Sequence, residues 1–140
     1  MANKILVKDI MPKDVKVVQN ETSAQEVVSI MAKNDVDAVL VVQSGKPTGI
    51  ITNLDVLIRA IASGATLTSI IARMIYTNPL VTIEESATLE EAAQLMLNWK
   101  IHHLPVTQNG KLVGMVTYID LAFSAPALLP KLKELWRPTK

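Results

Sequence analysis

The chain is an internal duplication. A shift of 65 residues, with no gap from Lys16 to Val56, superimposes the first half on the second with nine identities in 41 positions. Average composition would give about two or three identities. Four of the identical pairs bear on turns and candidate sites: Gly45 with Gly110, Gly49 with Gly114, Thr52 with Thr117 and Asp55 with Asp120. The chain is therefore a tandem repeat, and both halves should adopt the same fold.

The same strands are predicted in both halves from short apolar runs. They cover residues 15–18, 39–42 and 49–52 in the first half and 80–83, 104–107 and 114–117 in the second. Ser44-Gly45 and Asn109-Gly110 separate the last two strands of each half. These dipeptides supply the positive φ of a tight hairpin turn, so we expect an antiparallel hairpin in each half.

Two helices are predicted in each half. Ser23-x-x-Glu26 and Thr88-x-x-Glu91 precede apolar residues at helical spacing, and in each motif the hydroxyl and the carboxylate satisfy free amides of a first helical turn. A second helix follows each hairpin. In the first half its apolar stripe consists of Leu54, Leu57, Ile58 and Ile61.

The resulting order in each half is strand, helix, strand, strand, helix, an α/β arrangement. A half of about 60 residues covers too little of its sheet alone, so we expect the repeats to pack together as a pseudo-twofold module. The first repeat would span residues 1–63 and the second 64–124, followed by a tail, 125–140. Pro126 shortens the last helix of the second repeat. Pro130 begins a short amphipathic helix in the tail, whose leucines we expect to dock on the module or on a second copy.

Composition disfavours several classes of function. The absence of cysteine excludes thiol catalysis and cysteine-based zinc sites. A formal net charge of +1 and 4% aromatic residues disfavour a nucleic-acid binder built on a charged face with stacking rings. The least polar long stretch, residues 57–75, contains two arginines, so we expect no membrane span and a cytoplasmic protein. Without a metal-ligand set or a nucleophile motif, we expect neither an enzyme nor a required cofactor.

Two kinds of residue are candidates for ligand binding. Thr52-x-x-Asp55 and Thr117-x-x-Asp120 lie where a strand ends and a helix begins. From the residues alone, each motif is either a helix cap or a site at which the carboxylate accepts hydroxyls and the helix start receives a phosphate. His102 and His103 are the only histidines, and neighbours on a strand face opposite ways, which prevents them from chelating one metal.

The order of these motifs resembles the cystathionine β-synthase (CBS) domain, which usually occurs in pairs. The resemblance covers residues 4–124 and rests on the opening 9–12 (Asp-Ile-Met-Pro), the closing segments 45–55 and 110–120, and residues 104–106 (Leu-Pro-Val). The second repeat departs from the pattern at residues 72–75, Ala-Arg-Met-Ile, after which two extra residues precede the predicted strand. Residues 101–106 also look like the Ile-His-Arg-Leu-Pro-Val stretch of AMP-activated kinase γ subunits, with His103 in place of arginine.

The resemblance implies a regulatory module without catalytic activity. In the family, the Thr and Asp commonly contact the phosphate and ribose of an adenosine nucleotide, in a cleft that joins one repeat's motif to the start of the other repeat's central strand. This pairing implies two candidate sites: Ile50, Thr52 and Asp55 with Ile101, His102 and His103, and Met115, Thr117 and Asp120 with Val36, Asp37 and Ala38. The first set offers two imidazoles to a phosphate, and the second offers a carboxylate, so we expect the first to take the phosphorylated ligand.

We therefore expect an energy-sensing, homodimeric module that binds AMP, ADP or ATP, with AMP favoured, and signals to a regulated partner protein. The apolar stripe of the second helix would form the dimer interface, since a twofold interface needs only one self-complementary patch. Two alternatives stay open. One is an assembly protein with degenerate clefts, favoured by the acidic Asp37, and the other is a nucleic-acid-associated protein that uses its basic tail.

Overall fold

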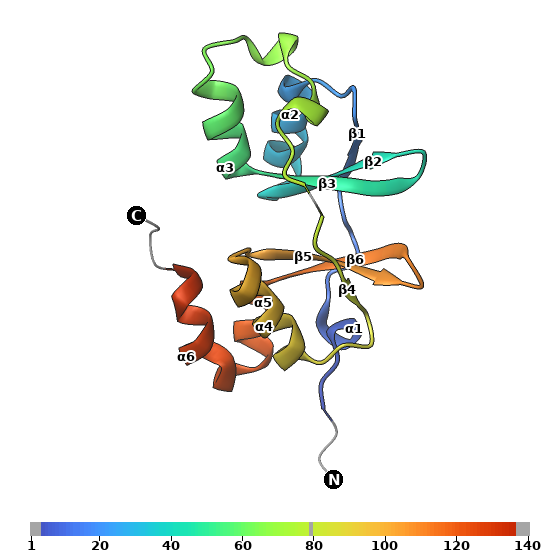
Figure 1. Cartoon of the computed structure of the whole chain (residues 1–140), viewed down its shortest axis with the longest axis vertical. Helices are drawn as coiled ribbons and strands as arrows, with labels where there is room; N and C mark the ends of the chain where they lie inside the picture. The colour runs from blue at the N-terminus through green and yellow to red at the C-terminus, as the bar shows by residue number, and fades with distance from the viewer. Residues whose placement is uncertain (1–3, 79, 137–140) are drawn as a thin grey trace. The chain divides into compact units, whose positions relative to one another are not determined.

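The computed structural model describes residues 4–78 and 80–136 (Figure 1). The chain forms two compact units. Residues Val15–Leu80 make one, here called the continuous unit, and the described residues up to Asp14 join those from Val81 onward in the other, the discontinuous unit. These units divide the chain differently from the predicted boundaries at residues 63 and 124. Residues 4–14 belong with the second repeat, and the described part of the tail belongs to the same unit.

Each unit contains one three-stranded sheet with the same topology (Figure 1). The three strands lie side by side in the order in which they occur in the sequence. The first is parallel to the second, and the second is antiparallel to the third. The strands are β1 (Val17–Gln19), β2 (Ala38–Gln43) and β3 (Lys46–Thr52) in the continuous unit, and β4 (Ile83–Glu84), β5 (His103–Gln108) and β6 (Lys111–Thr117) in the discontinuous unit. The predicted strands are confirmed, although β1 and β4 begin two and three residues later than expected.

The hairpins turn at the predicted dipeptides. Ser44 and Gly45 have φ of 53° and 79°, and Asn109 and Gly110 have φ of 52° and 83°. Two consecutive positive φ values match the right-handed twist of the flanking strands. The turns thereby fix the register that ends each β-hairpin at Thr52 and Thr117.

The first helix of each repeat is capped as predicted. Helix α2 (Ala24–Asn34) starts at Ser23, whose hydroxyl accepts a hydrogen bond from the Glu26 amide. Helix α4 (Leu89–Trp99) starts with a complete capping box between Thr88 and Glu91. Each helix buries one stripe against its own sheet, which creates one apolar core in each unit. The buried helical residues are Ala24, Val27 and Met31 in α2 and Leu89, Ala92, Ala93 and Met96 in α4.

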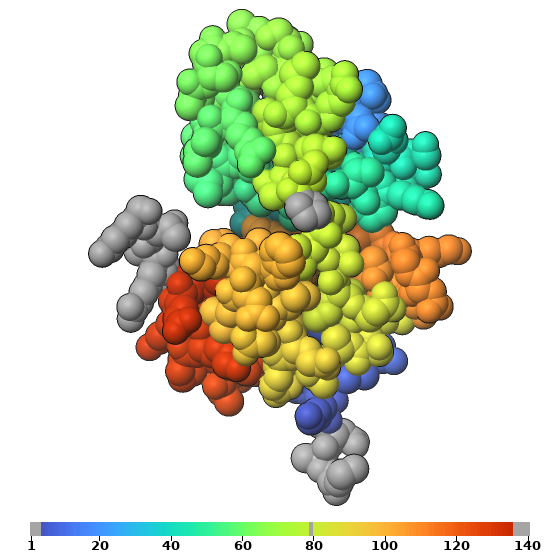
Figure 2. Space-filling view, viewed as in Figure 1, coloured from blue at the N-terminus to red at the C-terminus, as the bar shows by residue number. Residues whose placement is uncertain are grey.

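The second helices leave an apolar surface uncovered. In the continuous unit, α3 (Asn53–Asp55) continues into the π-helix η1 (Val56–Ile61), which buries Val56 and Ala60. The predicted stripe lies on the exposed side of this segment, green in Figure 2, with side chains more than half exposed: Leu54, Leu57, Ile58 and Ile61. In the discontinuous unit, α5 (Tyr118–Ser124) ends before Pro126, as predicted.

The opening segment of each repeat packs on the sheet of the other repeat. Helix α1 (Val7–Ile10) leads to Pro12, whose carbonyl accepts a hydrogen bond from the Met115 amide of β6 at 3.2 Å. The short helix η3 (Ala72–Met74) leads to Thr77, which exchanges two hydrogen bonds with Ile50 of β3, at 2.8 and 3.2 Å. Proline has no amide to donate, so the first contact has one hydrogen bond and the second has two.

The expectation of two extra residues before the second repeat's first strand is wrong. The Met11 amide bonds to the Val7 carbonyl at 3.0 Å, and the Tyr76 amide bonds to the Ala72 carbonyl at 3.1 Å. Both pairs keep the spacing of 65, which therefore extends through the opening segments. The structural counterpart of Met11 is Tyr76. The two residues differ in type, so a comparison of residue identities does not pair them.

The described part of the tail is helical and docks on its own unit, as predicted. It forms η4 (Pro126–Leu128), α6 (Leu129–Leu132) and η5 (Lys133–Trp136). Leu128 and Leu132 are buried in the core of the discontinuous unit, where α6 packs against α4 and α5 (Figure 1). The tail is thus part of this unit's core.

Candidate functional site

The motif Thr52-x-x-Asp55 is a capping box at the junction of β3 and α3. The Asp55 carboxylate accepts hydrogen bonds through Oδ2 from the Thr52 amide at 2.9 Å and from the Thr52 hydroxyl at 3.3 Å. The Asp55 amide donates to Thr52 Oγ1 at 3.4 Å. These contacts fix the carboxylate in one orientation and direct its second oxygen away from the cap.

The motif Thr117-x-x-Asp120 has the same geometry at the junction of β6 and α5. Asp120 Oδ2 accepts from the Thr117 amide at 2.9 Å and from the Thr117 hydroxyl at 3.1 Å, and the Asp120 amide donates to Thr117 Oγ1 at 3.3 Å. The capping interpretation therefore holds for both motifs. It leaves the ligand-binding interpretation open, because each carboxylate has a second oxygen that the cap does not use.

The second oxygens of the two aspartates differ in their partners. Asp55 Oδ1 accepts a hydrogen bond from the Thr77 hydroxyl at 3.0 Å and lies 3.5 Å from Arg59 Nε. Arg59 also donates through Nη1 to the Tyr76 carbonyl at 3.3 Å. Asp120 Oδ1 receives no hydrogen bond from the residues that the structure describes. The sequence analysis missed Thr77 and Arg59, because nothing in their local sequence points to Asp55.

The two histidines lie beside Thr117 in the discontinuous unit. His103 begins β5 opposite Thr117, and the His102 carbonyl accepts the Tyr118 amide at 3.0 Å. The His102 ring lies 4.8 Å from the Tyr118 ring, centroid to centroid, and its Nε2 is 2.8 Å from the Leu135 carbonyl oxygen in the tail. His102 thus contacts the tail as well as the start of α5.

The other candidates lie at the start of the central strand of their own unit. Ala38 lies opposite Thr52, and the Asp37 carbonyl accepts the Asn53 amide at 2.9 Å. Val36 and Ile101 each follow the end of a helix, with amides bonded to the carbonyls of Met31 and Met96. Each unit therefore brings one Thr-x-x-Asp motif next to the start of its own central strand. The expected combination of one repeat's motif with the other repeat's strand stays a prediction.

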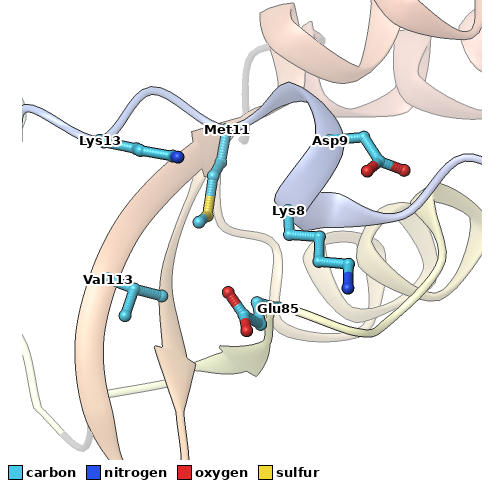
Figure 3. Close-up of a pocket in the computed structure, with 6 residues that line it drawn as sticks. All are labelled: Lys8, Asp9, Met11, Lys13, Glu85 and Val113. Carbon is cyan, nitrogen blue, oxygen red and sulfur yellow. The ribbon is translucent and has the colours of Figure 1, made fainter.

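A shallow pocket of about 440 Å³ lies in the discontinuous unit, away from these motifs (Figure 3). Met11 and Val113 give it an apolar wall, and its charged lining consists of Lys8, Asp9, Lys13 and Glu85. Two ammonium and two carboxylate groups balance one another, which gives the pocket no preference for an anion or a cation. The sequence analysis did not anticipate it.

Two searches of the described residues gave negative results. No helix within 4–78 or 80–136 is long and apolar enough to cross a bilayer. In the same part of the chain, no three histidine, aspartate or glutamate side chains converge as a metal site would require.

Known proteins match the chain over most of its length. The CBS domain family matches residues 7–61 and 71–125. The CBS domain-containing protein YhcV of Bacillus subtilis is 34% identical over 116 residues, covering 83% of this chain and 82% of YhcV. The uncharacterized protein MK0525 of Methanopyrus kandleri is 32% identical over 132 residues, covering 93% of this chain and 67% of that protein.

Solved structures agree with the fold. The CBS domain protein TA0289 of Thermoplasma acidophilum superimposes with a TM-score of 0.88, covers 99% of this chain and 79% of its own, and is 20% identical. The CBS domain pair of protein MJ0100, in complex with 5′-methylthioadenosine and S-adenosyl-L-methionine, has a TM-score of 0.77 at 26% identity and covers 89% of this chain and 98% of its own. With the family match at both repeats, the chain belongs to the CBS domain family and carries the domain twice.

Proposed function

We propose that this chain is a non-catalytic regulatory module that binds an adenosine-containing ligand and passes the bound state to a partner protein. AMP, ADP and ATP are the favoured ligands, and the module needs no cofactor. The observation that carries the proposal is the pair of Thr-x-x-Asp motifs, each with a carboxylate fixed by its own threonine. The adenosine compounds bound to the MJ0100 pair support the same class of ligand.

The chemistry of such a site follows from the fixed carboxylate. A short side chain held by two hydrogen bonds can accept two further ones from a ribose diol without losing side-chain entropy on binding. Hydrogen bonds to an ionised acceptor are stronger than those between neutral groups. The imidazoles of His102 and His103 are the proposed donors to a phosphate, and the expected pairing of these histidines with Ile50, Thr52 and Asp55 belongs to this proposal.

A thermal-shift panel tests the proposal directly. A ligand at 100 times its dissociation constant stabilises the folded state by about 2.7 kcal/mol, which raises the midpoint of a chain of this size by roughly 5 to 11 °C. AMP, ADP, ATP and 5′-methylthioadenosine are the test compounds, and CMP and GMP are matched controls. A chain whose midpoint stays unchanged with every adenosine compound at millimolar concentration would contradict the proposal.

The exposed stripe on α3 and η1 favours assembly as a second function. Leu54, Leu57, Ile58 and Ile61 are 54 to 60% exposed, and a contiguous apolar surface of this kind marks an interaction site. The proposed occupant is a second copy of the chain, which makes the protein a homodimer. Assembly without ligand response is the outcome that would replace the regulatory proposal.

A further inference from the structure

The pocket in the discontinuous unit is built on backbone segments that hydrogen bonds hold together. The Lys8 amide donates to the Glu85 carbonyl at 2.9 Å, which joins α1 to the residue after β4. The Met115 amide donates to the Pro12 carbonyl at 3.2 Å, which joins the opening segment to β6. The main chain that carries the lining residues is thus fixed by the fold, so ligand binding there costs little backbone ordering.

The charged side chains of this pocket do not neutralise one another. Within residues 4–78 and 80–136, the side chains of Lys8, Lys13 and Glu85 form no ion pair or hydrogen bond. The Asp9 carboxylate accepts one hydrogen bond, from the Leu6 amide at 2.9 Å, and has the capacity to accept more. Both signs of charge are therefore available to a ligand.

The apolar wall lies next to these charges. Met11 is buried, and its sulfur would be 2.7 Å from a Cβ at Gly114, so its side chain lies on β6. Figure 3 shows Met11 pointing toward the space between Val113 and Glu85. A ligand that reaches the charged groups therefore places an apolar group against Met11 and Val113.

The continuous unit does not carry the same combination of residues. At the spacing of 65, the six lining residues correspond, in the same order, to Arg73, Met74, Tyr76, Asn78, Asn20 and Thr48. Arg73 is the charged member of this set, and the Tyr76 ring covers Gly49. The two carboxylates and the second ammonium group are thus particular to the discontinuous unit, and the fold that the repeats share does not require them.

A ligand with a single charge is disfavoured in this pocket, because it meets a like charge as well as an opposite one. An α-amino acid carries both charges on one carbon, and the volume of about 440 Å³ is in the usual range for small-molecule sites. We propose that the pocket binds an α-amino acid with an apolar side chain. Lys8 and Lys13 receive its carboxylate, Glu85 receives its ammonium group, and the apolar wall receives its side chain. This inference does not depend on the proposed adenosine site.

Titration of the full chain with L-leucine, followed by NMR, tests the proposal. The methyl signals of Met11 and Val113 should shift with a dissociation constant on the order of 1 mM, as expected for so small a ligand. Isocaproate lacks the ammonium group of leucine, isoamylamine lacks its carboxylate, and glycine lacks its side chain. Each should bind at least about fivefold more weakly than leucine. Unshifted methyl signals with leucine, or equal affinities for leucine and these analogues, would overturn the proposal.

Two variants that remove opposite charges test the roles of the side chains. Glu85→Gln leaves the pocket positive, so the affinity for isocaproate relative to leucine should rise about threefold. Lys13→Gln leaves it negative, so the affinity for isoamylamine relative to leucine should rise by about the same factor. Neither side chain has a partner among the described residues, so both variants should fold. Glu21→Gln makes the same charge change on the exposed surface of the continuous unit and should leave every affinity unchanged. If either lining variant leaves its ratio unchanged, the assignment is wrong.

Discussion

The Nε2 atom of His102 lies 2.8 Å from the carbonyl oxygen of Leu135. A carbonyl oxygen only accepts hydrogen bonds, so Nε2 carries the hydrogen in this contact. In a neutral imidazole, Nδ1 is then an acceptor, so His102 can donate to a phosphate only as an imidazolium or after Nε2 leaves the Leu135 carbonyl. The tail thereby controls which donor His102 can offer to a ligand.

The first prediction concerns the tautomer of His102. Nitrogen-15 NMR of the imidazole should show the Nε2–H form for the neutral ring in the full chain. Leu132→Ser, which removes an apolar anchor of the tail, should shift the ring toward a mixture of tautomers. Lys133→Ala is the matched control, because it changes a tail residue on the exposed side. A dominant Nδ1–H form in the full chain would contradict the contact.

The second prediction concerns the stability that the tail contributes. Leu132 is fully buried, so Leu132→Ala should lower the free energy of unfolding by about 2 to 5 kcal/mol through lost burial and an added cavity. Lys133→Ala, at an exposed neighbouring position, should change it by less than about 0.5 kcal/mol. Urea unfolding measures both variants. Equally small changes in the free energy of unfolding would show that the tail does not contribute to the stability of the core.

Local sequence patterns were sufficient to predict the secondary structure, whereas contacts between residues far apart in the chain were not predicted. The capping motifs, the hairpin turns and the helical stripes each act within about seven residues, and the duplication confirms each of them. The contact between Pro12 and Met115 joins residues far apart in the chain through a backbone carbonyl. Every residue type has a backbone carbonyl, so the sequence does not indicate which one will act as an acceptor. For this reason the packing of each opening segment on the other repeat's sheet was not predicted.

The candidate site shows the same limit. The Thr-x-x-Asp motifs and their internal geometry were predictable, because three residues separate the partners. Thr77 is 22 residues from Asp55, and Leu135 is 33 residues from His102. Their partners depend on packing of the opening segment and of the tail, so only the folded chain reveals them.

The third prediction concerns the glycines beneath the opening segments. A Cβ at Gly49 would collide with the Tyr76 ring, and one at Gly114 would lie 2.8 Å from the Pro12 carbonyl oxygen. Gly49→Ala and Gly114→Ala should each destabilise the fold by about 1 to 3 kcal/mol. Adding Tyr76→Ala should relieve part of the cost at Gly49. Adding Met11→Ala should relieve less of the cost at Gly114, because it removes the contact with Met11 Sδ at 2.7 Å while the Pro12 backbone remains. Additive effects of Gly49→Ala and Tyr76→Ala in urea unfolding would argue against the close contact.

The fourth prediction is a homodimer formed through the stripe on α3 and η1. Light scattering at micromolar concentration should report about twice the chain mass of 15.3 kDa. Ile58→Glu buries a charge in the proposed interface and should give the single-chain mass. Met74→Glu, equally exposed but on η3, is the control that should leave the dimer intact. A single-chain mass for the unmodified protein would remove the claim.

The fifth prediction concerns acid sensitivity of the cap on α4. Hydrogen bonds from the Thr88 backbone and hydroxyl to Glu91 lower the pKa of this carboxyl below its usual value. The charged cap therefore contributes its full stability above the ordinary glutamate pKa, and this contribution is lost as the pH falls through the lowered folded-state value. Glu91→Gln keeps an acceptor without the charge, so its stability deficit relative to the unmodified chain should shrink as the pH falls below the ordinary glutamate pKa and through the lowered folded-state value. Glu90→Gln, a neighbour outside the cap, controls for loss of a first-turn charge, and a deficit independent of pH would contradict the assignment.

The exchange of opening segments has a consequence for the order of folding during synthesis. Every residue of the continuous unit has left the ribosome once Leu80 emerges, whereas the discontinuous unit must wait for Leu132 before its core is complete. Domains fold as their residues become available, so the continuous unit folds first while Val7 and Met11 remain without their core. Protease protection in ribosome-stalled chains should therefore begin in the middle of the sequence, and protection that began with the first residues would show that this order is wrong.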